Sequence, residues 1–290
     1  MRREHAGSFH PTITTMVDAL LDPFREPIAQ RALLDVALLG VTGGALGCWI
    51  VFYELSYSAE SLAHALLPGL VAASLLGLPL LLGGLAGALV AALAIALAGR
   101  VPEIGRDTAV ALVVTALFGL GVVLAFSPDS PPGIGSLLFG DVLGVSRADV
   151  GLAAGLAVLV LGALRLLHGQ LLAVGFDRAN ARALGARPLL ADTALLVLVA
   201  LAILVAVQGL GNLLVVAVLV GPAATARQLA RRMVPMMALA AALAIAAGAG
   251  GLYLSHYAKT AGGASIAGVI VAGYLAALAL RATVPRPAKA

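Results

Sequence analysis

Long apolar stretches, separated by short polar or charged patches, run along almost the whole chain. An apolar run of about 18 residues or more can cross the ~30 Å hydrocarbon core of a bilayer as a helix. The stretches lack the two-residue alternation of barrel strands, and helices are the other way to satisfy the backbone in lipid. The pattern predicts an all-α, polytopic transmembrane bundle of about eight or nine spans. The predicted segments are residues 32–52, 60–77, 80–98, 107–126, 150–167, 189–207, 211–230, 235–254 and 264–280.

The composition supports the same fold class. Hydrophobic residues make up 61% of the chain and charged residues 11%, whereas a soluble domain carries about 25% charged residues. The net charge of +4 does not indicate a nucleic-acid ligand, because the basic residues lie at segment ends, where they set orientation and meet anionic lipid. We therefore expect a multi-pass protein of the cell membrane, either an inner or a plasma membrane.

Arginine patches predict which side of the membrane each loop faces. Cytoplasmic loops carry the excess of Lys and Arg. From residue 107 onwards, the basic patches fall on one side if residues 127–148, residues 208–211 and the loop with Lys259 lie outside. Upstream, Arg25 and Arg31 favour a cytoplasmic N-terminus, but three full spans would then place Arg100 and Arg106 outside. Either one early segment is not a simple crossing or the N-terminus is outside. We favour eight full spans plus one broken or partial span.

The chain is expected to form one domain. Residues 1–31 lack the apolar core and small-residue cleavage site of a signal peptide. We interpret them as a cytoplasmic lead segment, although the charge pattern leaves its side open. Residues 32–282 would form a single transmembrane domain, and residues 283–290 a cytoplasmic tail.

Glu60 and His64 form the first candidate site. They are four residues apart, so on a helix their side chains lie on one face. A carboxylate oxygen and an imidazole nitrogen suit a divalent cation such as zinc or manganese, and ionisable groups within membrane segments are candidate functional groups. Pro68 and Gly69 could break the same helix, as at transporter sites. The alternative is a Glu at an interfacial helix end, with His64 hydrogen-bonded to a neighbouring helix.

A second candidate lies in the longest basic loop, at residues 176–185. Asp177 can cap a short helix and Gly185 can end it, with Arg178 and Arg182 on one face. Such a helix, lying parallel to the membrane, could dock into a partner. The alternative is a solvated loop helix. Ala179, Ala183 and Leu184 offer small apolar surface for docking, and Phe176 begins the segment.

A third candidate runs from Asn212 to Thr225. Pro222 removes an intrahelical hydrogen bond and Gly221 eases a kink. Asn212 and Thr225 could satisfy the freed backbone groups or line a path. A plain proline kink explains the pattern equally well.

Several motifs are absent from the sequence. It contains no Gly-x-x-x-x-Gly-Lys-Ser/Thr, so a nucleotide cannot bind through a Walker loop. It also contains no His-Glu-x-x-His and no Gly-x-Ser-x-Gly, the motifs of zinc proteases and serine hydrolases. We expect a transport protein rather than an enzyme.

The motifs, taken in order, resemble those of permease subunits of ABC-type zinc, manganese and iron importers, from about residue 27 to 280. The residues that carry the resemblance are the acidic-x-x-x-His of Glu60 and His64 followed by Leu67-Pro68-Gly69, the Leu138-Phe-Gly-Asp141 run, Phe176–Gly185, Asn212 to Arg227, and Gly263-Ala-Ser-Ile266. Many members have Asp where this chain has Glu60, which leaves coordination possible on a longer arm but puts the metal preference in doubt.

The resemblance implies a fold, partners and a substrate. The fold would be that of a type II ABC importer permease, with residues 176–185 as the cytoplasmic coupling helix. The partners would be two cytoplasmic ATP-binding subunits, an extracytoplasmic metal-binding protein and a second copy of the chain. Glu60 and His64 would contact a zinc, manganese or iron ion in transit as substrate, and no cofactor would be bound permanently.

Two alternative functions remain open from the sequence. One is an ion-coupled secondary metal carrier that acts without an ATPase. The other is an ABC permease for an iron chelate or cobalamin, which would need a wide, largely uncharged path without a Glu–His pair.

Overall fold

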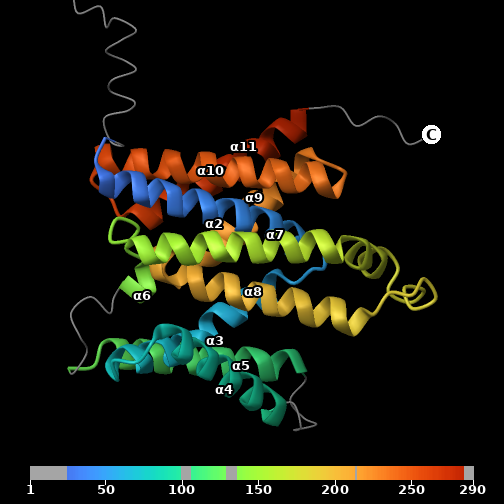
Figure 1. The fold of residues 1–290 in the computed structure, drawn as a ribbon, viewed down its shortest axis with the longest axis horizontal. Coiled ribbons are helices and arrows are strands. Elements are labelled where there is room, and N and C mark those ends of the chain that lie inside the picture. The colour runs from blue at the N-terminus through green and yellow to red at the C-terminus, as the bar shows by residue number, and fades with distance from the viewer. Residues whose placement is uncertain (1–24, 99–105, 129–135, 213, 284–290) are drawn as a thin grey trace, which may run out of the picture.

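The computed structural model describes residues 25–98, 106–128, 136–212 and 214–283, and within these residues all regular secondary structure is helical (Figure 1). Each predicted apolar segment lies largely on one helix. The helices are α2 (Pro27–Phe52), α3 (Ser56–Leu75), α4 (Leu80–Ala98), α5 (Arg106–Ala125), α6 (Ser136–Phe139), α7 (Arg147–Phe176), α8 (Pro188–Leu210), α9 (Val215–Leu229), α10 (Met233–Ala258) and α11 (Gly262–Thr283).

Some helix bounds differ from the prediction for local reasons. α7 begins earlier than predicted because Ser146 and Asp149 form a capping box, in which each side chain accepts from the other's backbone N–H. α9 begins later because Gly211 adopts φ 76°, a left-handed conformation that ends α8. The predicted break at Pro68 is absent: α3 continues through it and ends only before Gly77, which has φ 65°.

Six helices in the described part of the chain are long and apolar enough to cross a membrane: α2, α5, α7, α8, α10 and α11. α4 and α9 contain shorter apolar stretches, Leu80–Ile95 and Val215–Leu229. The predicted total of eight or nine spans is therefore not confirmed. The prediction of a multi-pass, all-α bundle is confirmed.

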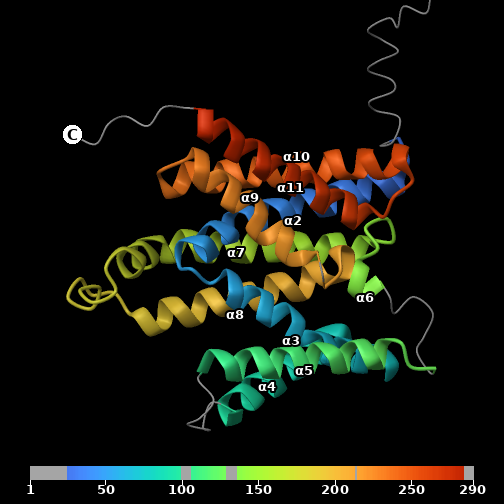
Figure 2. The same cartoon turned by 180° about the vertical axis from the view of Figure 1, so that it is seen from behind.

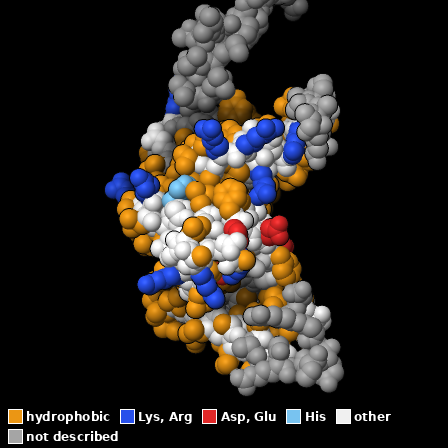
Figure 3. Space-filling view, turned by 90° about the vertical axis from the view of Figure 1, so that its right-hand side faces the viewer, with side chains coloured by type: hydrophobic (Ala, Val, Ile, Leu, Met, Phe, Trp, Pro, Cys, Tyr) orange, Lys and Arg blue, Asp and Glu red, His pale blue; other side chains and the backbone are white. Residues whose placement is uncertain are grey.

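The basic loops gather at one end of the bundle. Figure 1 places the connection between α7 and α8 at the end opposite the start of α2, together with the turn between α9 and α10 and the end of α11. Figure 3 faces this end, which we call the arginine-rich end, and shows blue side chains spread across it. If this end faces the cytoplasm, α2 begins on the outer side. The arginine pattern left two options, and this arrangement corresponds to the one in which the N-terminus lies outside.

α2 is the central helix of the bundle. Of its most apolar 18-residue window, 72% is buried, against 28% for the windows of α7 and α10, so α2 packs on several sides while α7 and α10 face outward. Small residues allow the close packing: a Cβ atom on Gly44 would lie 2.6 Å from the backbone N of Ala241 on α10. Figure 2 shows α9 and α11 on the opposite face from that of Figure 1.

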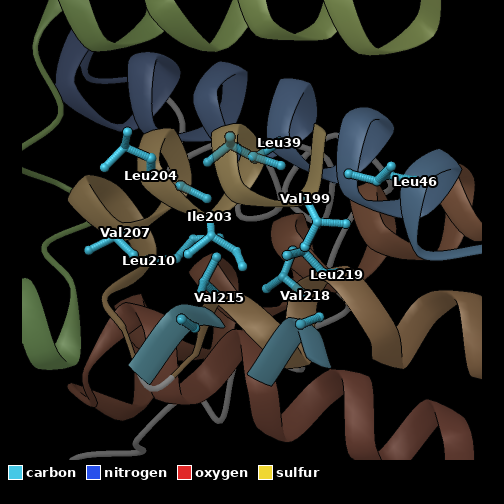
Figure 4. Packing of buried hydrophobic residues seen from close by; sticks show 14 of the residues in the cluster. Leu39, Leu46, Val199, Ile203, Leu204, Val207, Leu210, Val215, Val218 and Leu219 are labelled. Carbon is cyan, nitrogen blue, oxygen red and sulfur yellow. The ribbon is translucent and has the colours of Figure 1, made fainter. Parts of the chain in front are cut away.

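Branched apolar side chains fill the space between α2, α8 and α9. In Figure 4, Leu39 and Leu46 of α2 approach Val199 and Ile203 of α8 and Leu219 of α9. Because lipid tails are as apolar as these side chains, dispersion contacts rather than removal of water stabilise this packing. Asn212, between α8 and α9, contacts α3 through the hydrogen bond from its side chain to the oxygen of Ala63.

Candidate metal site

α3 brings Glu60 and His64 together, as their spacing predicts. Glu60 Oε1 and His64 Nε2 lie 3.9 Å apart. A tetrahedral zinc ion at ~2.0–2.2 Å from each ligand atom would hold the two about 3.4 Å apart, so a small rotation of the side chains would bring both onto one ion. The Glu60 side chain is 57% exposed and that of His64 24%. The pair therefore opens to the surface of this chain rather than into a closed cavity.

Asn212 fixes the orientation of the His64 ring. His64 Nδ1 lies 3.1 Å from Asn212 Oδ1, and Asn212 Nδ2 donates to the main-chain oxygen of Ala63. Because a carbonyl oxygen can only accept, the amide nitrogen must face Ala63 and the amide oxygen must face His64. The His64 Nδ1–H is then the donor, so a neutral ring carries its lone pair on Nε2, the atom that faces Glu60.

Asn212 is itself held on several sides. Its side chain is fully buried, and its backbone N–H donates to the oxygen of Leu137 on α6 at 2.8 Å. On the other side of His64, the Phe118 ring of α5 packs with its centroid 4.6 Å from that of the imidazole. Four parts of the chain far apart in sequence, α3, α5, α6 and the α8–α9 junction, therefore set the position of one imidazole.

Pro68 and Gly69 lie one turn beyond His64. Pro68 has no N–H, so it cannot donate to the carbonyl of His64, its partner in a regular helix. Gly69 lies against α4, where an added Cβ would be 2.8 Å from the Cα of Gly87. The His64 carbonyl thus lacks its regular helix donor next to the candidate ligands, and α3 packs tightly against α4 at Gly69.

Gly221, Pro222 and Thr225 do not join the Glu60–His64 pair. They lie within α9, and Thr225 Oγ1 donates to the oxygen of Gly221 at 2.9 Å. This bond back to the preceding turn often accompanies a bend in a helix. Pro222 and Thr225 also line a cavity of about 160 Å³ with residues of α10 and α11, so the proline kink and the path-lining role both stay predictions.

Residues 177–185 form successive hydrogen-bonded turns rather than the short helix that the sequence predicts. Three of the bonds span only three residues, from Ala183, Leu184 and Gly185 to the oxygens of Asn180, Ala181 and Arg182. Gly185 then reverses the chain at φ 75°. The result is a compact, exposed loop at the arginine-rich end. Phe176, Ala179, Arg182 and Ala183 are exposed there.

Asp177 and Arg178 have partners within the chain. The side-chain and backbone amides of Asn180 both donate to the Asp177 carboxylate, at 2.7 and 3.0 Å, and lower its pKa below the usual value. Arg178 forms a bidentate ion pair with Asp192 of α8. The sequence placed Arg178 beside Arg182 on one docking face, whereas this ion pair turns Arg178 towards α8.

The described residues contain no group of three or more His, Cys, Asp or Glu side chains that could hold a metal ion. The Glu60–His64 pair alone would leave a four-coordinate ion half unliganded. Sequence reasoning identified this pair but missed the link from His64 to Asn212, 148 residues away. The available signal was Asn212 itself, a polar residue between Gly211, which ends α8, and an apolar run. This signal does not identify His64 as the hydrogen-bond partner.

Comparison with known proteins identifies the family. Residues 25–281 match the model of the ABC 3 transport family. A manganese transport system membrane protein, MntC, of Halalkalibacterium halodurans is 35% identical over 86% of this chain and 85% of its own length. A probable iron transport system membrane protein of Haemophilus influenzae is 31% identical over 91% and 97%.

A solved structure shares the fold. PsaBC from Streptococcus pneumoniae, in complex with Fab, aligns with a TM-score of 0.83 at 29% identity, covering 92% of this chain and 95% of that one. A putative metal-chelate type ABC transporter in an inward-facing conformation aligns at 0.61 with 12% identity, which is a likeness of fold alone. The family match spans almost the entire described chain, and the chain belongs to the ABC 3 transport family.

Proposed function

We propose that this chain is the membrane permease of an ATP-driven importer of a divalent transition metal, with manganese or iron as the first candidates. The observation that carries the proposal is the Glu60–His64 pair, with Nε2 of His64 directed at Glu60 by Asn212. Mixed carboxylate and imidazole ligands suit manganese, iron and zinc. Relatives named for manganese and for iron support the first two metals, and zinc stays as a third candidate.

We propose that a second copy of the chain completes the site. Glu60 is more than half exposed, and an uncovered carboxylate within a bilayer is costly. Two copies that meet at this surface would cover it and supply four ligands. Two weak pairs also suit transit better than storage, because an ion must leave as readily as it enters.

The energy and the metal would come from separate proteins. The sequence contains no Walker loop, so two cytoplasmic ATPases would drive transport, and a metal-binding protein outside the membrane would deliver the ion. The exposed turns at residues 177–185 would seat in a groove of the ATPase. Phe176 and Leu184, which are 77% and 74% exposed, supply apolar surface for that contact.

Metal uptake by proteoliposomes tests the proposal. The permease is reconstituted with its ATPase and binding protein, and uptake of manganese, iron and zinc is compared for Glu60→Gln, His64→Ala and the double variant. If the pair acts as a unit, the double variant should transport scarcely less than either single variant. Glu54→Gln and His256→Ala are matched controls, since both residues are exposed and lie outside the site.

Three results would contradict the proposal. Metal movement without any ATPase would favour a secondary carrier. Normal uptake by correctly inserted His64→Ala would reduce the pair to a structural polar contact on α3. Uptake of an iron chelate or cobalamin in place of the free ions would favour the other ABC permease class.

A further inference from the structure

Two cavities meet on the outward face between α7 and α10. One, of about 760 Å³, opens at the arginine-rich end. The other, of about 610 Å³, continues from it along the helices towards the middle of the bundle. His168 of α7 and Val234 of α10 line both cavities, so the two form one continuous groove.

The groove exists because α7 and α10 are separated by α2. Each of them packs extensively against α2, whereas α7 and α10 are not among the helix pairs that pack against each other. Figure 1 shows the three helices side by side, with α2 between the other two. Val41 and Ala45 of α2 form the floor, and Leu161 and Ala238 are apolar wall residues from α7 and α10. Arg165 and His168 are the polar residues of the α7 wall, and the other lining residues are apolar. A bilayer would therefore offer acyl chains to a mostly apolar channel.

The mouth of the groove is basic. Arg227, Arg231 and Arg232 line it. Arg227 donates to the oxygen of Val51 at 3.3 Å, while Arg231 and Arg232 are exposed and pair with no residue that the structure describes. Among the described lining residues of both cavities there is no Asp or Glu. Unneutralised guanidinium groups at the edge of a bilayer attract phosphate.

We propose that this groove binds a diacyl phospholipid with an anionic headgroup. The phosphate would lie between Arg231 and Arg232, and one acyl chain would lie along α2 between α7 and α10. Basic pockets between membrane helices on the cytoplasmic side are typical sites for anionic headgroups. A protein partner that engaged the arginines alone would leave the apolar groove, which faces the hydrocarbon, to ordinary bulk lipid. The combination of a basic mouth and a lipid-facing apolar channel favours a lipid.

Trp49 provides a built-in reporter for the proposal. It is the single tryptophan of the chain and is fully buried. Its ring centroid lies 5.4 Å from that of His168, which lines both cavities. A lipid with brominated acyl chains quenches tryptophan fluorescence at short range, so a chain in the groove should quench Trp49.

The experiment uses the full chain in phosphatidylcholine vesicles, titrated with brominated phosphatidylglycerol or with brominated phosphatidylcholine. We expect the anionic lipid to quench Trp49 at a much lower mole fraction. Arg231→Gln with Arg232→Gln should raise the half-quenching fraction by roughly 25-fold, about five-fold for each arginine. Arg187→Gln, a control at the same end but outside both cavities, should behave as the unsubstituted chain does.

A second variant tests the groove apart from the headgroup. Ala238→Phe fills the channel without a change of charge, so it should weaken quenching by the anionic lipid even with both arginines present. Equal quenching by the two lipids would overturn the proposal. The proposal would also be overturned if quenching were lost in the double arginine variant but kept in Ala238→Phe. The arginines would then attract the lipid at the surface without an acyl chain in the groove. Unchanged quenching with lost ATPase binding in the arginine variant would assign the arginines to a protein contact.

Discussion

The Nδ1 atom of His64 lies 3.1 Å from the side-chain oxygen of Asn212, and the amide nitrogen of Asn212 is turned away towards the Ala63 carbonyl. One asparagine therefore sets both the tautomer and the direction of the imidazole. Outer partners of this kind orient metal ligands and are worth 10–100-fold in metal affinity in known sites. In this chain the outer partner comes from the α8–α9 junction, so a movement of α9 relative to α3 would change how His64 presents its nitrogen.

The first prediction concerns this contact. Asn212→Leu should keep the volume of the side chain but release the His64 ring, and the metal concentration for half-maximal uptake should rise by about 10–100-fold. Ser74→Ala, at the far end of α3, should leave it unchanged. Uptake kinetics in proteoliposomes measure both. An unaltered half-maximal concentration in Asn212→Leu would show that His64 needs no orienting partner.

The second prediction concerns pH at the loop of residues 177–185. The hydrogen bonds from Asn180 depress the pKa of Asp177 below 3.8. A carboxylate with a lowered pKa stabilises the folded turns above its unfolded pKa, and this contribution is lost as pH falls through the lower, folded value. Amide-exchange protection factors of residues 180–186 should therefore be constant from neutral pH down to about 4 and fall below it.

The charge of Asp177 is the tested variable. Asp177→Asn should give lower protection at neutral pH and little further change with acidification. Asp149→Asn, which alters the capping box at the other end of α7, should follow the unsubstituted chain. If the protection factors of Asp177→Asn fell with pH as those of the unsubstituted chain do, the acid sensitivity would belong to another group.

The third prediction tests the same loop as the ATPase contact. Ala183 is exposed among turns at the arginine-rich end, and a larger side chain there should block close approach while the helices stay intact. Ala183→Trp should abolish stimulation of the ATPase by the permease in a reconstituted complex. Ala282→Trp, an exposed position near the end of α11, is the matched control. Full stimulation in Ala183→Trp would place the ATPase contact elsewhere.

Sequence reasoning found the parts of this protein that depend on local pattern. Each apolar segment falls on a helix, and the spacing of Glu60 and His64 gives their proximity directly. The contact with Asn212 depends on how α8 and α9 pack, which no local pattern contains. The central position of α2 was equally hidden, because in lipid an inner and an outer helix can both be apolar all round.

The loop at residues 177–185 shows a different limit. Its cap residue Asp177 and its ending glycine Gly185 were identified from the sequence, and both act at those positions. The helix expected between them is replaced by turns, since bonds across three residues compete with bonds across four in so short a segment. The partner of Arg178 is Asp192, on the next helix, and sequence spacing alone could not pair them across the intervening loop.

The last prediction uses two glycines that look alike in sequence. Gly44 of α2 faces α10, and a Cβ there would lie 2.6 Å from the backbone N and 2.7 Å from the carbonyl carbon of neighbouring α10 residues, Ala241 and Ala240. Backbone cannot rotate away as a side chain can, so Gly44→Ala must push α10 from α2. Forcing an extra methyl into close packing costs about 1–3 kcal/mol. At Gly151 of α7, a Cβ meets nothing within 4 Å. Gly151→Ala should therefore stabilise its helix by roughly 0.5–1 kcal/mol, the helix-propensity difference between the two residues.

Thermal unfolding of the two purified variants in detergent distinguishes these effects, because the same chemical change should lower the midpoint at Gly44 and raise it slightly at Gly151. The comparison also tests the place of α2 in the bundle. Since α10 is the helix that α2 contacts most closely through Gly44, a harmless Gly44→Ala would mean that the two helices stand further apart than in this fold. Loss of stability at Gly151 would instead show that α7 is covered there, by a second copy of the chain or by a partner, and would make that face an interface rather than a lipid-exposed surface.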